Sequence, residues 1–324
     1  MQRIDLLREW LRARLGRDDF ELLPASADAS FRRYFRLQPS GGPSLIAMDA
    51  PPEHEDCGPF VHVARLFAAA GVHVPHVMAE DLERGFLLLS DLGTATYLDS
   101  LDAGSADALY LDALRSLVRI QAATRAGELP QYDRALLERE MRLFPDWYVG
   151  RQLGRELGDA DRETLEAAFQ AILAENLAQP RVYVHRDYHS RNLMVSDPNP
   201  GIIDFQDAVI GPITYDLVSL LRDAYIEWPE QQVIDWCIRY WELARKASLP
   251  VPADFGEFYR AFEWMGVQRQ LKVVGIFARL CHRDGKEAYL KDQPLVMRYL
   301  KRACRRYGEL AALAALLDRL DPAA

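Results

Sequence analysis

Two short apolar segments, each followed by polar residues, decide the fold: Val182-Tyr183-Val184-His185-Arg186-Asp187-Tyr188-His189-Ser190-Arg191-Asn192 and Gly201-Ile202-Ile203-Asp204-Phe205-Gln206-Asp207. Each segment begins as a short strand and ends in a polar loop. Asp187 stands in the first loop, Asn192 follows five residues later, and Asp204 directly follows the second strand. We expect neighbouring strand ends to bring one amide and two carboxylates into a single cavity.

This combination of side chains suits phosphoryl transfer to a hydroxyl group. Such a reaction needs a carboxylate that orients the hydroxyl and accepts its proton, together with oxygen ligands that hold Mg²⁺ against the phosphates of a nucleotide. The spacing predicts Asp187 as the catalytic base and Asn192 with Asp204 as the Mg²⁺ ligands. A lone aspartate in a loop is more often a cap or turn residue, so the prediction depends on the whole set.

The order and spacing from about Ala25 to Leu221 resemble the aminoglycoside-phosphotransferase and choline-kinase superfamily, whose fold is that of the protein kinases. The resemblance implies an α+β protein that uses ATP, with a small N-terminal lobe built on an antiparallel sheet and a larger, mainly helical C-terminal lobe. It also implies that His185 braces the catalytic loop and that Asp216 ties this loop to the next helix. Only eleven residues separate Asp204 from Asp216, which leaves no room for a phosphorylatable activation loop and favours a metabolite kinase.

The length and the apolar patterns fit two lobes. At 324 residues and 49% hydrophobic content, the chain exceeds the length at which single cores usually divide. The N-terminal lobe, expected at 1–92, should hold a helix over 4–15, a hairpin of strands over 31–37 and 44–48, a helix over 59–70 and a strand over 86–89. The C-terminal lobe, expected at 93–324, should be mainly helical, with 182–184 and 201–203 as its only convincing strands.

The composition narrows the class of ligand. A net charge of −9 has the wrong sign for a protein whose main partner is nucleic acid or an anionic membrane, so a small or neutral ligand is expected. The four cysteines form no CxxC pair, which argues against a zinc knuckle or a redox dithiol. The N-terminus is unlike a secretory signal, and no apolar run approaches the ~20 residues of a membrane span. We therefore expect a cytoplasmic protein.

The N-terminal lobe lacks a charge pair that kinase-like proteins usually carry. In those proteins a lysine on the third strand pairs with a helix glutamate and touches the nucleotide phosphates. All five lysines of this chain lie at or beyond residue 246, the lysine position falls on Met48, and the helix over 59–70 has no acidic residue. The joint absence is physically consistent because a buried unpaired charge is costly.

Arginine is the expected substitute for that lysine. A turn at 27–32 replaces a glycine-rich loop and brings three arginines close together in sequence, whose planar forks suit phosphate oxygens. At least one of them is expected to bind phosphate, although a solvated strand face would explain them equally well. Adenine is expected beside Tyr34 and Ile46, with backbone contacts at 89–91. The predicted nucleotide-binding residues are Ser30, Arg32, Arg33, Tyr34, Arg36, Ile46, Leu89 and Asp91.

Three phrases, at 30–36, 48–52 and 143–148, resemble bacterial members of the superfamily that phosphorylate amino sugars. This resemblance implies transfer to the anomeric C1 hydroxyl of N-acetylmuramate and N-acetylglucosamine, in peptidoglycan recycling. Aromatic faces and polar forks hold sugars, and an arginine such as Arg142 or Arg151 would suit the carboxylate of N-acetylmuramate. Core packing is the alternative for the tryptophans. The predicted substrate-binding residues are Glu140, Arg142, Trp147, Tyr148, His189, Arg191, Tyr225 and Trp228.

Two other functions stay open. The first is a kinase for another small alcohol, such as an aminoglycoside, choline or homoserine; an aminoglycoside would call for several carboxylates, whereas 141–155 has only one acidic residue. The second is a nucleotide-binding regulator without catalysis, which the missing lysine and glutamate would suggest. Against it, Asp187, Asn192 and Asp204 are all present.

Overall fold

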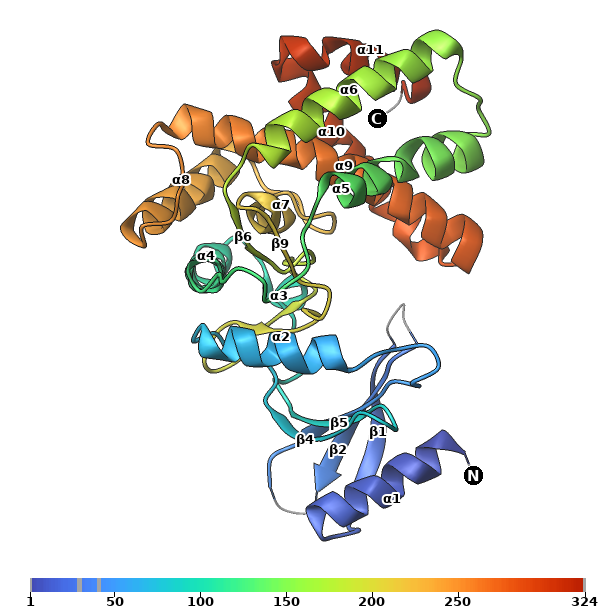
Figure 1. Ribbon diagram of the computed structural model, residues 1–324, viewed down its shortest axis with the longest axis vertical. Helices are drawn as coiled ribbons and strands as arrows, with labels where there is room; N and C mark the ends of the chain where they lie inside the picture. The colour runs from blue at the N-terminus through green and yellow to red at the C-terminus, as the bar shows by residue number, and fades with distance from the viewer. Residues whose placement is uncertain (1, 28–30, 40–41, 323–324) are drawn as a thin grey trace. The chain divides into compact units, whose positions relative to one another are not determined.

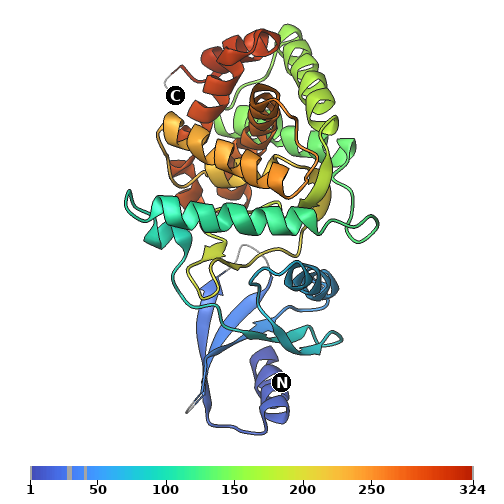
Figure 2. The same ribbon diagram turned by 90° about the vertical axis from the view of Figure 1, so that its left-hand side faces the viewer.

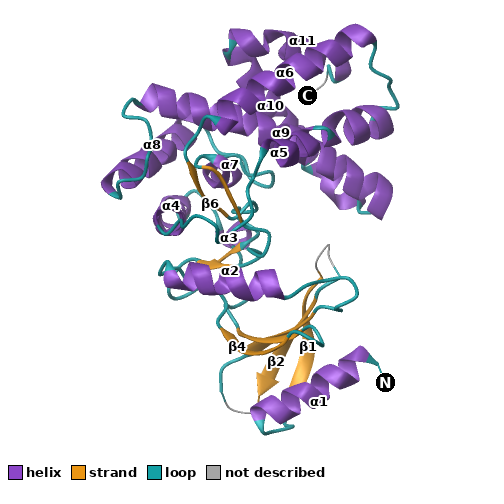
Figure 3. Cartoon of the chain, in the orientation of Figure 1, coloured by secondary structure: helices purple, strands orange, loops and turns teal. Residues whose placement is uncertain are grey.

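The computed structural model describes residues 2–27, 31–39 and 42–322 (Figure 1). The chain divides into two compact units. Unit 1 comprises Met1–Ser100 and Asn192–Asp207, and unit 2 comprises Leu101–Arg191 and Ala208–Ala324. Strands concentrate in unit 1, whereas helices make up most of unit 2 (Figure 3).

A five-stranded antiparallel sheet in the order β1-β2-β3-β5-β4 forms the centre of unit 1. Its strands are β1 (Phe20–Ala27), β2 (Arg33–Pro39), β3 (Leu45–Asp49), β4 (Val77–Asp81) and β5 (Phe86–Ser90). The helices of unit 1 are α1 (Arg3–Leu15), α2 (Gly58–Ala69) and α3 (Tyr97–Ser100), and a short pair is formed by β7 (Leu193–Met194) and β8 (Gly201–Ile202). The predicted α+β class, with an antiparallel N-terminal sheet, is therefore confirmed.

The strand register sorts the side chains of the sheet onto two faces. Directly opposite residues of antiparallel strands point to the same side. On one face, Leu37, Ala47 and Leu88 pack against Leu7 and Trp10 of α1, which lies along this face (Figure 1). The other face carries Tyr34, Arg36, Ile46, Met48, Leu87 and Leu89. Four of the eight residues predicted to bind nucleotide, Tyr34, Arg36, Ile46 and Leu89, thus share the face that α1 leaves uncovered.

The segment Asn192–Asp207 is distant in sequence from the rest of unit 1 but packs into it. The ring of Phe205 lies 4.9 Å from that of Phe60 and 5.8 Å from that of Phe67, both on α2. His73 forms a parallel bridge with Gly201, which fixes the segment to the chain between α2 and β4. The residues predicted to bind metal are therefore attached to the same unit as the sheet.

Unit 2 is built around one long helix, α9 (Phe255–Asp284). Asp254 caps its start, accepting the N–H of Glu257 at 2.9 Å, and Gly285 ends it with a left-handed φ of 68°. A Cβ at Gly275 would lie 2.4 Å from the carbonyl carbon of Leu143, so glycine permits this close approach. The other helices, several of which pack on α9, are α4 (Ala106–Ala122), α5 (Arg134–Met141), α6 (Asp159–Leu177), α7 (Tyr215–Leu221), α8 (Glu230–Lys246), α10 (Gln293–Arg306) and α11 (Ala311–Leu320).

Shorter elements complete unit 2. They are a π-helix, η1 (Phe144–Gln152), the 3₁₀ helices η2 (Glu287–Lys291) and η3 (Gly308–Leu310), and an antiparallel pair of strands, β6 (Arg181–Val184) and β9 (Val209–Pro212). Figure 2 shows α4 alongside α8, which pack together within this unit. In the described part of the chain, no helix combines the length and the apolar character that crossing a membrane requires.

Elements with a strong apolar pattern are confirmed, and the weak ones are not. The helices predicted at 4–15 and 59–70, the hairpin that became β2 and β3, and the strand at 86–89 all form. The expectation of only two strands beyond residue 93 is wrong, because β7 and β9 also form there. β7 has only two residues, and β9 contains Gly211 and Pro212, so neither presents a recognisable strand pattern. β1, which was also missed, contains Pro24 and a register shift.

Candidate active site

The loop that follows β6 is held in place by buried groups of unit 2. His185 is fully buried, and its backbone N–H donates to Asp216 Oδ2 at 2.6 Å. The next N–H, of Arg186, donates to Asp216 Oδ1 at 3.0 Å. His185 Nδ1 accepts the backbone N–H of Asp187 at 3.3 Å. His185 and Asp216 thus occupy the bracing positions that the resemblance implied.

Arg186 turns the chain immediately before Asp187. Its φ of 78° lies in the left-handed region, which non-glycine residues rarely adopt. Its guanidinium donates to Glu140 Oε1 at 2.7 Å and lies 5.6 Å from the ring centroid of Tyr132. Among the described residues, the other non-glycine residues with positive φ are Asp204 and Ser248. Two of the three unusual backbone conformations therefore fall on the predicted catalytic and metal loops, where strain often marks function.

The surroundings of Asp187 favour its ionised form. Burial raises the pKa of Asp187, but the positive charges of Lys272, Arg186 and Arg269 outweigh burial and leave the pKa below its ordinary value. Burial instead dominates at Asp216 and raises its pKa to about 7. Asp187 is therefore a carboxylate at neutral pH, which is the state that a proton acceptor needs.

The two predicted metal ligands lie together in unit 1. Asn192 Nδ2 donates to Asp204 Oδ2 at 3.2 Å, and Gln206 Nε2 donates to Asp204 Oδ1 at 2.8 Å. A φ of 64° at Asp204 turns the backbone one residue beyond the position that follows β8. Aspartate tolerates this left-handed conformation better than most residues, because its short polar side chain can bond locally.

These two side chains fit Mg²⁺. Asn192 and Asp204 offer amide and carboxylate oxygens, which are hard ligands. In the described residues no group of three or more histidine, cysteine, aspartate or glutamate side chains could hold a metal. A site with few protein ligands suits Mg²⁺, which retains waters and binds nucleotide phosphates in addition to one or two protein groups.

The three arginines of the first hairpin have different partners. Arg32 Nη2 lies 3.8 Å from Asp204 Oδ1, and its side chain is only 11% exposed. Arg33 pairs with the buried carboxylate of Asp49 on the α1 face of the sheet. Arg36 Nε donates to Asp91 Oδ2 at 2.5 Å. Arg32 alone among the three is paired with a predicted metal ligand.

The remaining predicted nucleotide residues lie on the uncovered face of the sheet or at its end. Tyr34, Ile46 and Leu89 share that face with Arg36. The carboxylate of Asp91 accepts bonds from Arg36, from the Ser44 hydroxyl at 2.7 Å and from the Gly93 N–H at 2.9 Å, so its side chain is already engaged. Ser30 lies outside the described residues.

Three of the predicted substrate-binding residues meet in unit 2. The ring of His189 lies 5.5 Å from that of Tyr225, edge to face. The guanidinium of Arg191 stacks over Tyr225 at 3.5 Å from the ring centroid. His189, Arg191 and Tyr225 thus form one cluster beside the catalytic loop, which we call the acceptor cluster.

The other predicted substrate residues are engaged elsewhere in unit 2. Glu140 is buried and bonded to Tyr132 and Arg186. Arg142 pairs with Glu138 and Glu166 on the surface, and Tyr148 donates to Asp321 Oδ2 at 2.9 Å. Trp228 packs edge-on against Trp236, and its indole N–H donates to the Tyr110 hydroxyl at 2.9 Å. Trp147 is half-buried in η1. The structure does not bring these five residues together.

Residues not anticipated from the sequence complete the acceptor cluster. Asp223 accepts the Ser190 N–H at 2.9 Å and the Tyr225 N–H at 3.1 Å, and so ties the catalytic loop to the segment after α7. Asp292 Oδ2 lies 3.8 Å from Arg191 Nη2, too far for a hydrogen bond. Three buried polar atoms there have no hydrogen-bond partner: His189 Nδ1, Ser190 Oγ and Asp292 Oδ2. Such atoms are rare in folded proteins and are suited to a polar ligand.

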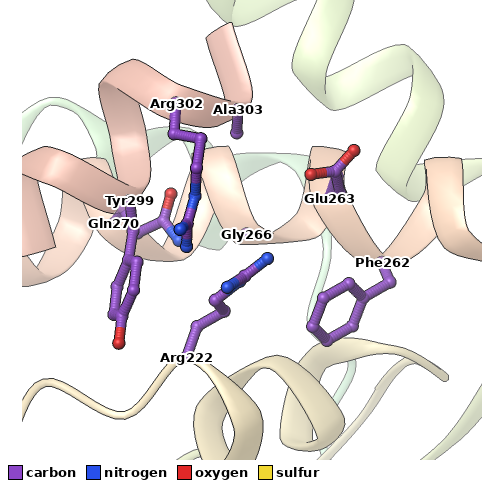
Figure 4. A pocket seen from close by; sticks show the side chains of 8 residues that line it. All are labelled: Arg222, Phe262, Glu263, Gly266, Gln270, Tyr299, Arg302 and Ala303. Carbon is purple, nitrogen blue, oxygen red and sulfur yellow. The ribbon is translucent and has the colours of Figure 1, made fainter. Parts of the chain in front are cut away.

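A small pocket elsewhere in unit 2 is too narrow for a sugar or a nucleotide. It lies between α7, α9 and α10 and is lined by Arg222, Phe262, Glu263, Gly266, Gln270, Tyr299, Arg302 and Ala303 (Figure 4). It leaves about 10 Å³ for the centre of a water molecule, which is room for roughly one water. Arg222 and Arg302 pair with Glu230, so these charges stabilise the packing of the helices.

The sequence model of the phosphotransferase enzyme family matches residues 21–249. The chain belongs to this family. The match begins in β1, includes every predicted catalytic and metal-binding residue, and ends just after α8. This phosphotransferase therefore carries Asp187, Asn192 and Asp204 within the matched region.

Full-length relatives and solved structures agree with this assignment. The phosphotransferase is 56% identical to an N-acetylmuramate/N-acetylglucosamine kinase of Pseudomonas aeruginosa, over 94% of this chain and 90% of the relative. It is 52% identical to the protein of the same name from Neisseria meningitidis, over 99% of this chain and 96% of the relative. Its fold is similar to that of ADP-bound aminoglycoside phosphotransferase APH(2'')-Ib, with a TM-score of 0.59, 15% identity and coverage of 91% and 96% of the two chains. For choline kinase LicA of Streptococcus pneumoniae, the TM-score is 0.62, with 13% identity and coverage of 95% and 98%.

Sequence reasoning missed Lys272, Asp223 and Asp292 of this phosphotransferase. Lys272 had a detectable signal, because it is a lone lysine within the otherwise apolar stretch Leu271–Phe277 at the middle of a helix, a place where lysine is seldom found without a partner. Asp223 and Asp292 had none. Each precedes or follows a helix, where aspartate is common.

Proposed function

We propose that this phosphotransferase transfers the γ-phosphoryl group of Mg·ATP to the anomeric C1 hydroxyl of N-acetylmuramate and N-acetylglucosamine. The observation that carries the proposal is the 52–56% identity, over at least 94% of this chain, to relatives named as kinases of these two sugars. The sequence analysis also predicted an N-acetylated amino sugar as the acceptor, which is more specific than the prediction of a small-molecule kinase. The choice of the anomeric hydroxyl rests on the same resemblance.

In this proposal Asp187 accepts the proton of the acceptor hydroxyl. Its low pKa keeps it ionised at neutral pH, and an anomeric hydroxyl is more acidic than an ordinary alcohol. A modest base is therefore sufficient, and most of the acceleration comes from positioning and charge neutralisation. His185 and Asp216 hold the backbone around the base through the hydrogen bonds described above.

On the nucleotide side, Asn192 and Asp204 would hold Mg²⁺, which neutralises the charge of the phosphates when it is bound. Arg32, already paired with Asp204, takes the phosphate-binding role for which the chain has no N-terminal lysine. Adenine would lie on the sheet face of Tyr34, Ile46 and Leu89. Arg33 lies on the opposite face of the sheet and pairs with Asp49, so it is not part of the proposed site.

The acceptor cluster is the proposed sugar site. Arg191 covers one face of Tyr225 and so presents its guanidinium in this cluster, and the atoms of His189, Ser190 and Asp292 that lack hydrogen-bond partners suit hydroxyl and amide groups. Arg191 is the arginine in this cluster that would pair with the carboxylate of N-acetylmuramate. Arg142, predicted for that role from the sequence, is paired with two glutamates instead.

The first test is a panel of acceptors. Sugar-dependent release of ADP is measured with N-acetylmuramate, N-acetylglucosamine, kanamycin and choline at equal concentrations. We expect activity with the two amino sugars only. Activity with kanamycin or choline alone would replace the proposal by one of the other small-alcohol kinases, and no acceptor-dependent release at all would favour a nucleotide-binding regulator.

A blocked acceptor tests the position of transfer. The methyl glycoside of N-acetylglucosamine keeps every hydroxyl except the one at C1, so we expect no ADP release above the rate without sugar. Free N-acetylglucosamine serves as the matched control. A 6-phosphate of the methyl glycoside, detected by phosphorus NMR, would refute anomeric transfer and leave only the amino-sugar kinase.

A further inference from the structure

A buried ionic cluster lies directly behind the catalytic loop in unit 2. Lys272, on the middle turns of α9, is 6% exposed, and its ammonium lies 3.2 Å from Glu140 Oε1 and 2.8 Å from the Tyr215 hydroxyl. Glu140, on α5, is equally buried and also accepts from Arg186 at 2.7 Å. The hydroxyl of Tyr132 donates to the second oxygen of Glu140. We call Glu140, Lys272 and the partly buried Arg186, whose side chain is 20% exposed, the buried triad.

The triad carries an excess positive charge. Two cations, Arg186 and Lys272, share the single carboxylate of Glu140. Burial raises the pKa of Glu140 but its two cations outweigh burial and lower it, and the pKa of Lys272 is raised by Glu140 against the effect of burial. All three groups are therefore charged at neutral pH. An uncompensated buried charge is costly, so a further anion is required nearby.

Asp187 is the anion next to the triad. It directly follows Arg186 in the chain, and Lys272 is the strongest of the charges that act on it. The other groups that face it are Arg186 and His189 on its own loop, Arg269 on α9 and Asp216 on α7. The pKa of His189 is lowered by burial, which keeps the ring neutral. Asp216, whose pKa is about 7, is only partly ionised at neutral pH, so it does not cancel the charge of Arg269 and the excess remains.

We propose that Lys272 is a positioning residue for phosphoryl transfer: through Glu140 it fixes the left-handed turn at Arg186, and its charge is balanced by the carboxylate of Asp187. The proposal rests on the role of Asp187 as the base in the proposed function. It differs from a purely structural ion pair, because it links a side chain on α9 to the charge and the position of the base.

Lys272→Met tests the proposal, because methionine keeps the length of the side chain and removes its charge. The chain offers a matched control in Lys301→Met. Lys301 is 2% exposed, donates to the carbonyl oxygen of Asp321 and lies 3.5 Å from Asp318 Oδ1 in the same unit. A second variant, Lys272→Met with Glu140→Gln, removes one charge of each sign, so we expect it to fold even if the single variant does not.

The first readout is the pH profile of sugar-dependent ADP release. Without Lys272 the pKa of Asp187 rises, so we expect the acid limb of kcat/KM to move to higher pH by about one unit or more. We also expect kcat at pH 7.5 to fall roughly 10-fold as the base loses its position, while KM for ATP stays unchanged. Lys272→Arg should restore the acid limb, and Lys301→Met should leave it in place. An acid limb unmoved in Lys272→Met, or moved equally in Lys301→Met, overturns the proposal.

The second readout does not depend on catalysis. Denaturant midpoints are measured for Asp187→Asn in the parent protein and in the Lys272→Met background. We expect Asp187→Asn to lower the midpoint of the parent, where it leaves the triad unbalanced, and to lower it clearly less in the Lys272→Met background, where the charge that Asp187 balances is already gone. Equal shifts in both backgrounds overturn the inference. If no sugar supports ADP release in the parent, the proposed function fails while this measurement still decides the link between Lys272 and Asp187.

Discussion

Buried carboxylates in unit 1 are neutralised by arginines, whereas the buried triad of unit 2 depends on a lysine. Asp49 is fully buried and pairs with Arg33, whose side chain is 49% exposed. Asp91 is held by Arg36 in a similar way. Lys272, in contrast, is almost entirely enclosed with Glu140. Arginine can bury part of its stem and keep its charge in contact with water, but an enclosed lysine keeps its charge only if its partners remain in place.

This difference between the two units indicates where the chain tolerates the loss of a charged side chain. On the proposed nucleotide side, the chain has no lysine before residue 246, and a fully buried Met48 occupies the position where the sequence comparison with kinase-like proteins predicts one. On the side of the base, a lysine is enclosed by charged neighbours, so its loss leaves Glu140 and Arg186 with altered partners. We therefore expect changes in unit 2 to alter kcat and changes in unit 1 to alter nucleotide binding.

The largest effect is expected for Asp187→Asn, which removes the proton acceptor without removing a predicted metal ligand. We expect kcat to fall by roughly 10²–10⁴-fold, the usual contribution of a general base, while the Kd for Mg·ATP is unchanged. ADP release gives the first quantity and calorimetric titration the second. A variant with near-normal kcat would show that Asp187 is not the base. A higher Kd for Mg·ATP would show that nucleotide binding also depends on a residue of unit 2.

Asp204→Ala, unlike Asp187→Asn, should weaken nucleotide binding. Deleting an anionic ligand from a hard-cation site should weaken Mg²⁺-dependent ATP binding by at least about 10-fold. The measurement is a titration of ATP at several Mg²⁺ concentrations. Asp207→Ala, which changes a neighbouring carboxylate outside the predicted ligand set, is the control. An unaltered Mg²⁺ dependence in Asp204→Ala would mean that the metal is held elsewhere.

Arg32→Ala should raise KM for ATP by roughly 10-fold, which corresponds to about 1.5 kcal/mol for a charge-assisted hydrogen bond. Arg33→Ala is a matched control from the neighbouring position. It leaves Asp49 with Arg3 as its partner and should lower the unfolding midpoint without raising KM. If Arg33→Ala raises KM and Arg32→Ala does not, the face of the sheet assigned to the nucleotide is wrong.

Met48→Leu should change least. The substitution is close to volume-conserving in a well-packed position and should cost less than about 1.5 kcal/mol of unfolding free energy. We expect kcat and KM for ATP to stay as in the parent, because Met48 carries no charge to the phosphates. A marked rise in KM with an unchanged unfolding midpoint would give Met48 a direct role in nucleotide binding.

The sequence predicted most of the elements that have a strong apolar pattern, and it located the two polar loops that follow β6 and β8. Helix α1 and the β2–β3 hairpin follow from local periodicity and turn residues alone. Asp187, Asn192 and Asp204 could be found because each stands at a fixed distance from a short apolar strand. Local patterns of this kind can be recognised in the sequence without knowledge of tertiary contacts.

Contacts between distant parts of the chain could not be predicted in this way. Arg32 meets Asp204 across more than 170 residues of sequence, and Lys272 meets Glu140 across more than 130. Glu140 and Trp228 have residue types suited to a sugar, yet their partners within unit 2 already satisfy them. Residue type indicates what a side chain can bind, whereas only packing determines which partner it has.

The separation of unit 1 into two stretches of sequence sets an order for its biosynthesis. The sheet and α2 are complete in sequence at Ser100, but Phe205, which covers Phe60 and Phe67, emerges about 100 residues later. At roughly 5–20 residues per second, a ribosome needs about 5–20 s to add that length. Throughout this interval the nascent chain exposes an apolar face of α2, a natural place for a chaperone to bind.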